Sequence, residues 1–184
     1  MNYKKIININ DIEKVLKKYK IKNKKIVQCH GVFDLLHIGH LKHFETAKKQ
    51  GEILIVSVTP DQYINKGFGR PVFKNQQRLE SLSSITEVDY VVLNNTSNAV
   101  NIINKIKPNY FCKGPDYKNQ KDDTTGQIKN EIYAVKKNGG KIIITNDKTY
   151  SSSKILNDIN SSYSPEQKAF IDKIKNKTNL TNFD

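Results

Sequence analysis

Tryptophan is absent from the 184-residue sequence, and cysteine occurs only twice. Cys29 and Cys112 each lie inside an apolar stretch, which argues against a disulfide framework and for core positions in a reducing, cytoplasmic setting. Long hydrophobic runs are also missing. No stretch approaches the roughly 18 apolar residues of a membrane span, and no signal segment opens the chain, so we expect no membrane partner.

Acidic side chains are scarce, with 18 Asp and Glu against 31 Lys and Arg, for a net charge of +13. Such a balance suits a nucleic-acid partner, since bound cations release counterions from a phosphate backbone. Only Arg70 and Arg78 are arginines, however, and the guanidinium is the cation best shaped to recognise bases and phosphates. The lysines are spread among many asparagines, a bias that an AT-rich genome also produces. We therefore expect no nucleic-acid partner, although small polyanionic substrates would be attracted.

The apolar residues gather in short dense runs despite a mean hydropathy of −0.64. These runs predict strands, and they alternate with segments of helical periodicity. The alternation predicts an α/β fold, a doubly wound parallel sheet of about five strands with a Rossmann-like order, which binds ligands at the carboxyl ends of its strands. The expected strands are 25–29, 53–58, 89–93, 110–112 and 141–145, and the expected helices are 9–19, 40–50, 75–85, 100–106 and 128–137.

The length suits one domain, which we place at residues 1–158. Residues 159–184 follow as a linker, polar and rich in turn formers at first, in which Pro165 opens a short C-terminal helix.

All four histidines lie between residues 30 and 43, directly after the first expected strand. His37 and His40 are three residues apart and can share the first turn of a helix. Amides at a helix start attract phosphate, Gly39 leaves room for it, and two imidazoles could neutralise charge at a reacting phosphorus. Core or zinc-binding histidines are the alternative. Zinc needs further ligands, no matching cysteine or carboxylate cluster is evident, and we expect no protein-bound metal.

The stretch GVFDLLHIGH resembles the HxGH signature of the cytidylyltransferase-like nucleotidylyltransferases. Residues 67–79, 113–117 and 150–155 resemble later motifs of these enzymes, in the same order. The likeness covers about residues 25–158, and its motifs are most similar to those of the adenylyltransferase domain of bifunctional ADP-heptose synthase.

The resemblance implies a role for each matching residue. His37, His40 and Arg78 would be catalytic, binding the triphosphate and stabilising the transition state. Lys66 and Arg70 would hold substrate phosphates. The implied nucleotide-binding residues are Gly31, Val32, Phe33, Asp34, Gly39, Lys113, Asp116, Ser151, Ser152 and Ser153.

Simpler interpretations stay open for several of these residues. Arg78 and Lys66 could be solvated surface side chains, and Asp34 could serve only a turn. Ser151 to Ser153 could be an ordinary helix N-cap.

The resemblance implies transfer of a nucleoside monophosphate from a triphosphate, with Mg²⁺, to a sugar phosphate such as a heptose 1-phosphate, releasing pyrophosphate. Residues 146–149 lack the arginine that cytidylyltransferase relatives carry before the serine motif, which favours ATP over CTP. A CTP-dependent glycerol- or polyol-phosphate cytidylyltransferase is the alternative, and a non-catalytic nucleotide- or nucleic-acid-binding module is a third. We also expect a homodimer and, because the tail resembles the connector of fused relatives, a sugar-kinase domain joined to this one.

Overall fold

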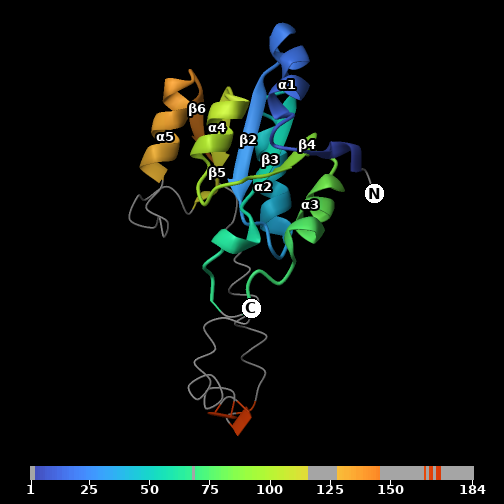
Figure 1. The fold of residues 1–184 in the computed structure, drawn as a ribbon, viewed down its shortest axis with the longest axis vertical. Helices are drawn as coiled ribbons and strands as arrows, with labels where there is room; N and C mark the ends of the chain where they lie inside the picture. The colour runs from blue at the N-terminus through green and yellow to red at the C-terminus, as the bar shows by residue number, and fades with distance from the viewer. Residues whose placement is uncertain are drawn as a thin grey trace.

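The structure, a computed structural model, describes residues 3–67, 69–115 and 128–145, together with residues 164, 166, 167, 169 and 170. In these parts six parallel strands form one sheet in the order β1-β4-β3-β2-β5-β6 (Figure 1). The predicted α/β parallel sheet is confirmed. The strands are β1 (Ile6–Ile7), β2 (Ile26–Gly31), β3 (Ile53–Val58), β4 (Tyr90–Leu93), β5 (Tyr110–Lys113) and β6 (Lys141–Ile144).

Helices cover both faces of this sheet. Helices α1, α4 and α5 pack on one face, and α2 and α3 pack on the other (Figure 1). Their bounds are α1 (Ile12–Ile21), α2 (Ile38–Lys48), α3 (Asn75–Ser83), α4 (Val100–Ile106) and α5 (Ile128–Lys137), with short 3₁₀ turns η1 (Tyr3–Lys5) and η2 (Asp61–Tyr63).

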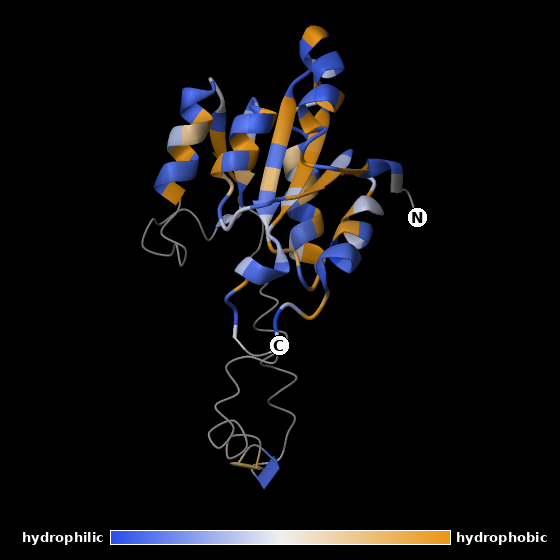
Figure 2. Ribbon diagram, in the orientation of Figure 1, coloured by the Kyte–Doolittle hydropathy of each residue, from blue (hydrophilic) through white to orange (hydrophobic). Residues whose placement is uncertain are grey.

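Alternate residues of the central strands build two separate cores. In β2, Ile26 joins the core with α1, α4 and α5, whereas Val27 and Cys29 join the core with α2 and α3. All six residues of β3 are buried. Apolar residues accordingly run along the middle of the sheet, and polar residues lie on the outer helix faces (Figure 2). A parallel sheet covered on both faces needs such continuous apolar strands.

The chain reverses its direction of winding at β2, which lies between β3 and β5. Connections from β2 and β3 run toward one edge, and the later strands β5 and β6 extend toward the other. Ligands in open α/β sheets bind where the order reverses, at the carboxyl ends of the strands. Gly31 ends β2 and Lys113 ends β5, so the predicted HxGH segment starts at this point.

Strand β1 was missed because two half-buried isoleucines are too short a run for periodicity to detect. The predicted boundary after residue 158 lies outside the described residues. Within the predicted C-terminal helix, the described residues 166, 167, 169 and 170 are helical. Among the described residues, no helix is both long enough and apolar enough to cross a bilayer.

Candidate active site

The HxGH segment forms a tight passage from β2 into α2. His37 is the N-cap residue with an extended backbone (φ −142°, ψ 169°), and its carbonyl accepts hydrogen bonds from the amides of His40 (2.9 Å) and Leu41 (3.3 Å). Gly39 lies in the first turn that follows. The imidazoles of His37 and His40 stack with their ring centroids 3.8 Å apart and their planes 22° from parallel. The spacing of three residues therefore places two imidazoles side by side at a helix start.

Phe33 has an unusual backbone conformation at this turn. Its φ of 50° lies in the left-handed region, which bulky side chains rarely adopt. The ring folds back beneath Gly31, where an added Cβ would lie 3.0 Å from the ring, and it packs edge-on against His40 at 5.4 Å. Gly31 and Phe33 thus form the support for the His40 ring. Strained backbone held by packing clusters at functional sites, which strengthens the assignment of a site here.

Both imidazoles of the stacked pair are held in their neutral form. Burial, followed by the charges of His37, His43 and Lys66, lowers the pKa of His40 to about 3. Burial also lowers the pKa of His37. The buried Nδ1 of His40 has no hydrogen-bond partner among the described residues. Buried polar atoms are normally paired, so an unpaired one at this position indicates a site that a ligand completes.

Asp34 joins this turn to a distant loop. Its buried carboxylate accepts hydrogen bonds from the amides of Val72 (3.0 Å) and Phe73 (2.8 Å) and from Nε of Arg70 (2.7 Å). Burial alone would raise the pKa of Asp34, but the two amides and the guanidinium together lower it, so the carboxylate is ionised. Asp34 therefore does more than serve a local turn, because it holds residues 70–73 against the HxGH segment.

The loop held by Asp34 carries two cations, Arg70 and Lys66. Arg70 is buried, and its Nη2 has no hydrogen-bond partner among the described residues. Lys66 lies on the exposed side of the loop, where desolvation and the charge of Arg70 lower the pKa of its ammonium group. Lys66 is also close enough to His40 to lower its pKa. Lys66 is thus near His40, and Arg70 is held to the HxGH segment through Asp34.

Arg78 lies behind the turn rather than on its surface. The side chain is fully buried, and its Nη atoms donate to the carbonyls of Val32 and Thr59, to Asp61 Oδ1 (2.7 Å) and to Asn75 Oδ1 (2.8 Å). The interpretation of Arg78 as a solvated helix residue is therefore wrong. These contacts fix the ends of β2 and β3 to the start of α3, which supports a positioning role rather than contact with a phosphate.

Lys113 lies on the other side of the sheet from the His37 and His40 pair, although its charge acts on His30. Phe111, two residues earlier in β5, belongs to the core with α4 and α5, and Lys113 shares that face, where it pairs with Glu131 of α5 at 2.7 Å. Both side chains are 6% exposed. Glu131 also accepts a hydrogen bond from the amide of Ala99 (3.2 Å), so this pair links the end of β5 to the start of α4. The structure does not bring Lys113 to the imidazole pair.

Two further histidines have contacts that the sequence did not indicate. His43 Nδ1 lies 3.0 Å from Thr145 Oγ1, which ties α2 to the end of β6. His30 lies between Ser57 Oγ (2.9 Å) and Thr59 Oγ1 (3.3 Å), and burial above all lowers its pKa to about 3. His43 follows His40 by three residues, as His40 follows His37, and this spacing could have predicted that His43 lies on the same side of α2.

Four of the predicted site residues, Asp116 and Ser151 to Ser153, lie outside the described residues. Within the described ranges, no group of three or more His, Cys, Asp or Glu side chains could hold a metal ion. The zinc interpretation of the histidines therefore finds no ligand set in that part of the chain.

Comparison with known proteins places this geometry in context. Residues 28–158 match the family described as cytidylyltransferase-like. The chain is similar to the bifunctional protein HldE of Desulfatibacillum aliphaticivorans, with 34% identity over 158 residues, which are 84% of this chain and 31% of that protein. It is also similar to the bifunctional protein HldE of Aliarcobacter butzleri, with 37% identity over 139 residues, 74% of this chain and 29% of that protein. The chain thus spans about a third of the length of these curated relatives.

Two solved structures share the fold. The lipopolysaccharide core biosynthesis protein from Thermoplasma volcanium superposes with a TM-score of 0.55 and 26% identity, over 70% of this chain and 99% of that one. Pantoate-beta-alanine ligase from Francisella tularensis also has a TM-score of 0.55, over 80% of this chain and 68% of that one, but its 19% identity supports the fold alone.

Proposed function

The chain belongs to the cytidylyltransferase-like family and carries a nucleotidyltransferase domain, and from this premise we propose that it transfers AMP from ATP to a sugar phosphate such as a heptose 1-phosphate. The observation that carries the proposal is the stacked imidazole pair at the end of β2. Lys66 lies close to His40, and Arg70 is tied to the same segment through Asp34. His40 Nδ1 and Arg70 Nη2 are both buried without a hydrogen-bond partner among the described residues. An anion with several oxygens is the ligand that such a group of donors would satisfy.

In the proposed reaction, an oxygen of the acceptor phosphate attacks the α-phosphorus of the nucleotide. The bond from that phosphorus to the bridging oxygen breaks, and pyrophosphate leaves with the electron pair. His37 and His40 would each donate an N–H to phosphate oxygens, and the arriving negative charge would raise their lowered pKa values. Lys66 and Arg70 would supply fixed positive charge. Positioning and charge stabilisation suffice for such a transfer, with no covalent intermediate.

Mg²⁺ would enter with the nucleotide in this proposal. The ion binds readily through phosphate oxygens and water with few protein ligands, which fits the lack of a carboxylate or histidine cluster among the described residues. When bound, it would neutralise charge on the departing pyrophosphate.

Two comparisons support a sugar acceptor. The relatives named HldE share 34% and 37% identity with this chain, and the solved structure with 26% identity is named for lipopolysaccharide core biosynthesis. Because those relatives are named bifunctional and are about three times as long as the matched region, we also propose that a sugar kinase supplies the substrate. The homodimer stays a prediction, which sedimentation equilibrium would check.

The nucleotide and the acceptor are tested together by pyrophosphate release. ATP and CTP are each supplied with heptose 1-phosphate or glycerol 3-phosphate, with Mg²⁺ present. We expect the highest kcat/KM for ATP with heptose 1-phosphate. Faster release from CTP with glycerol 3-phosphate would establish the alternative cytidylyltransferase, and no release with any pair would favour the binding module.

His37→Ala tests the imidazole pair itself. Removing one preorganised donor to a developing charge typically costs about 10²- to 10³-fold in kcat, and we expect a loss of that size. Lys42→Ala is the control, because Lys42 is exposed on the same helix and should leave the rate unchanged. A His37→Ala enzyme with normal kcat would remove the basis of the proposal.

A further inference from the structure

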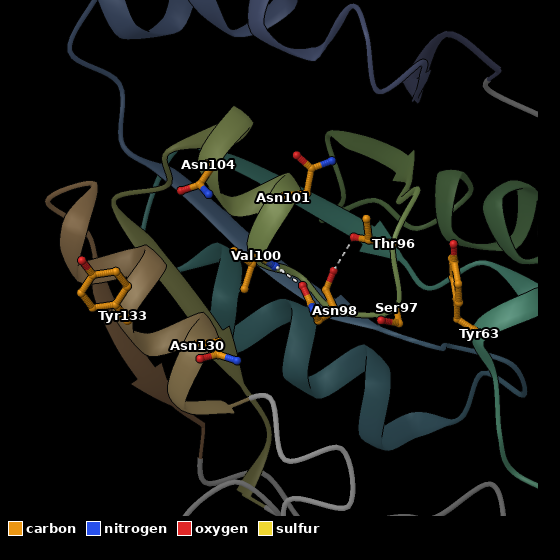
Figure 3. A pocket seen from close by; sticks show the side chains of 9 residues that line it. All are labelled: Tyr63, Thr96, Ser97, Asn98, Val100, Asn101, Asn104, Asn130 and Tyr133. Atoms are coloured by element: carbon orange, nitrogen blue, oxygen red, sulfur yellow. Dashed lines mark hydrogen bonds between the residues drawn. The ribbon is translucent and has the colours of Figure 1, made fainter.

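A hollow opens on the α4 and α5 side of the sheet, whereas the imidazole pair lies at the start of α2. It has a volume of about 680 Å³ and is formed by η2, the turn after β4, and the exposed sides of α4 and α5 (Figure 3). The lining residues are Tyr63, Thr96, Ser97, Asn98, Val100, Asn101, Asn104, Asn130 and Tyr133.

None of the described residues that line this hollow is charged, although 27% of the residues of the sequence are charged and its net charge is +13. Among these lining residues a phosphate group would find no cation, and a cationic ligand would find no carboxylate. The hollow is therefore unsuited to a triphosphate or to the phosphate of a sugar phosphate. Its chemistry selects for an uncharged ligand.

The polar lining is rich in amides that both donate and accept hydrogen bonds. Asn101 Nδ2 donates to Asn95 Oδ1 (2.7 Å), and Asn104 Oδ1 accepts from Asn138 Nδ2 (2.8 Å). These bonds orient both amides and leave the carbonyl oxygen of Asn101 as an acceptor and the amide nitrogen of Asn104 as a donor. Amides that donate and accept match hydroxyl groups, each of which also donates and accepts.

Two exposed tyrosines lie at opposite ends of the hollow, Tyr133 on α5 and Tyr63 on η2 (Figure 3). They are 68% and 41% exposed. An exposed aromatic ring offers a flat apolar face and a hydroxyl, which suits ligands with an apolar face and a polar edge. A pyranose ring has this character, with C–H groups on its faces and hydroxyls at its edge.

The floor of the hollow is already ordered. The side chain of Asn98 accepts a hydrogen bond from the amide of Val100 (3.0 Å), and its carbonyl accepts one from Thr96 Oγ1 (2.9 Å; Figure 3). Asn94 Nδ2 donates to the same carbonyl (2.7 Å). A preorganised floor lowers the entropy lost when a ligand binds.

From the uncharged described lining, the oriented amides and an exposed tyrosine at each end, we propose that this hollow binds a neutral saccharide ring, separately from the site of nucleotide transfer. The proposal does not depend on the transfer reaction. Either can fail while the other stands.

The test uses the full chain and methyl α-D-mannoside as the probe, followed by the side-chain amide resonances in ¹H–¹⁵N spectra. We expect saturable shifts of the amides of Asn101, Asn104 and Asn130. Asn130→Ala and Tyr133→Ala should each weaken binding about two- to tenfold, because each removes one or two contacts. Both residues are exposed, so the variants should fold, and thermal melting checks this.

Asn10→Ala is the matched control, an exposed asparagine outside the hollow that should leave the affinity unchanged. Mannose 1-phosphate serves as the charged comparison and should bind no more tightly than the neutral probe. Absence of saturable shifts, or shifts that both hollow variants leave unaltered, would overturn the proposal, as would binding of the phosphorylated sugar alone.

Discussion

Replacing Arg78 should lower the free energy of unfolding, because its buried guanidinium holds the carboxyl ends of β2 and β3 to the start of α3. In Arg78→Met the side-chain volume is nearly kept, but two backbone carbonyls, the Asp61 carboxylate and the Asn75 amide oxygen each lose one donor. The Asp61 and Asn75 side chains keep the hydrogen bonds from each other's backbone amides. Water reaches Asp61, which is 24% exposed, more easily than it reaches the two carbonyls. The loss of unfolding free energy should therefore be large, but smaller than the loss caused by breaking a fully buried ion pair.

The size of the effect follows from these contacts. Removing one partner of a buried ion pair costs about 3 to 5 kcal/mol, and because Asp61 is partly exposed we expect a loss of about 3 kcal/mol in the free energy of unfolding. Lysine keeps the charge but lacks the planar fork, so Arg78→Lys should restore one or two hydrogen bonds and cost about 1 to 2 kcal/mol. Against a typical domain stability of about 5 to 15 kcal/mol, either loss is measurable.

Urea unfolding followed by far-ultraviolet circular dichroism measures this change, because the chain has no tryptophan to report on unfolding. Lys14→Met, at an exposed position on α1, controls for removal of a charge. Pyrophosphate release is measured in parallel, at a temperature where every variant is folded. If Arg78→Met loses activity while its unfolding free energy stays within about 0.5 kcal/mol of the original, a typical surface substitution, then Arg78 acts on the nucleotide and the positioning argument is refuted.

Asp34→Asn should lower the unfolding free energy by about 1 to 3 kcal/mol, because the loop that carries Arg70 loses its charged acceptor. It should also raise KM for the nucleotide more than it lowers kcat. Unchanged KM and stability would contradict this role of Asp34, and Asp11→Asn, at an exposed position, is the control. Acid should destabilise the protein through His30, whose pKa of about 3 in the folded state lies below the ordinary value of 6.5. As the pH falls, His30 therefore binds a proton in the unfolded chain before it does so in the folded protein. Its contribution to the free energy of unfolding is complete above about pH 6.5 and decreases toward pH 3 by about 1.4 kcal/mol per pH unit. Urea unfolding at pH 7, 5.5 and 4.5 checks this, and a slope that His30→Gln does not reduce would assign the effect to other groups.

The repeated alternation of apolar strands with helices was enough to predict the sheet and its parallel sense. Helices α4 and α5 have the predicted bounds, and α2 begins two residues earlier than predicted because His37 acts as its N-cap. The three-residue spacing of His37 and His40 was enough to place their rings together, since neighbours on one helical turn depend only on local geometry.

Tertiary structure alone decided which predicted residues meet. The partners of Arg78 include Val32, 46 positions away, and the pairing of Lys113 with Glu131 depends on how α5 packs against the sheet. The hollow beside α4 likewise combines residues from η2, a turn and two helices. Periodicity along the chain shows which face of an element is buried, but not what packs against that face, because such contacts depend on the arrangement of elements far apart in sequence.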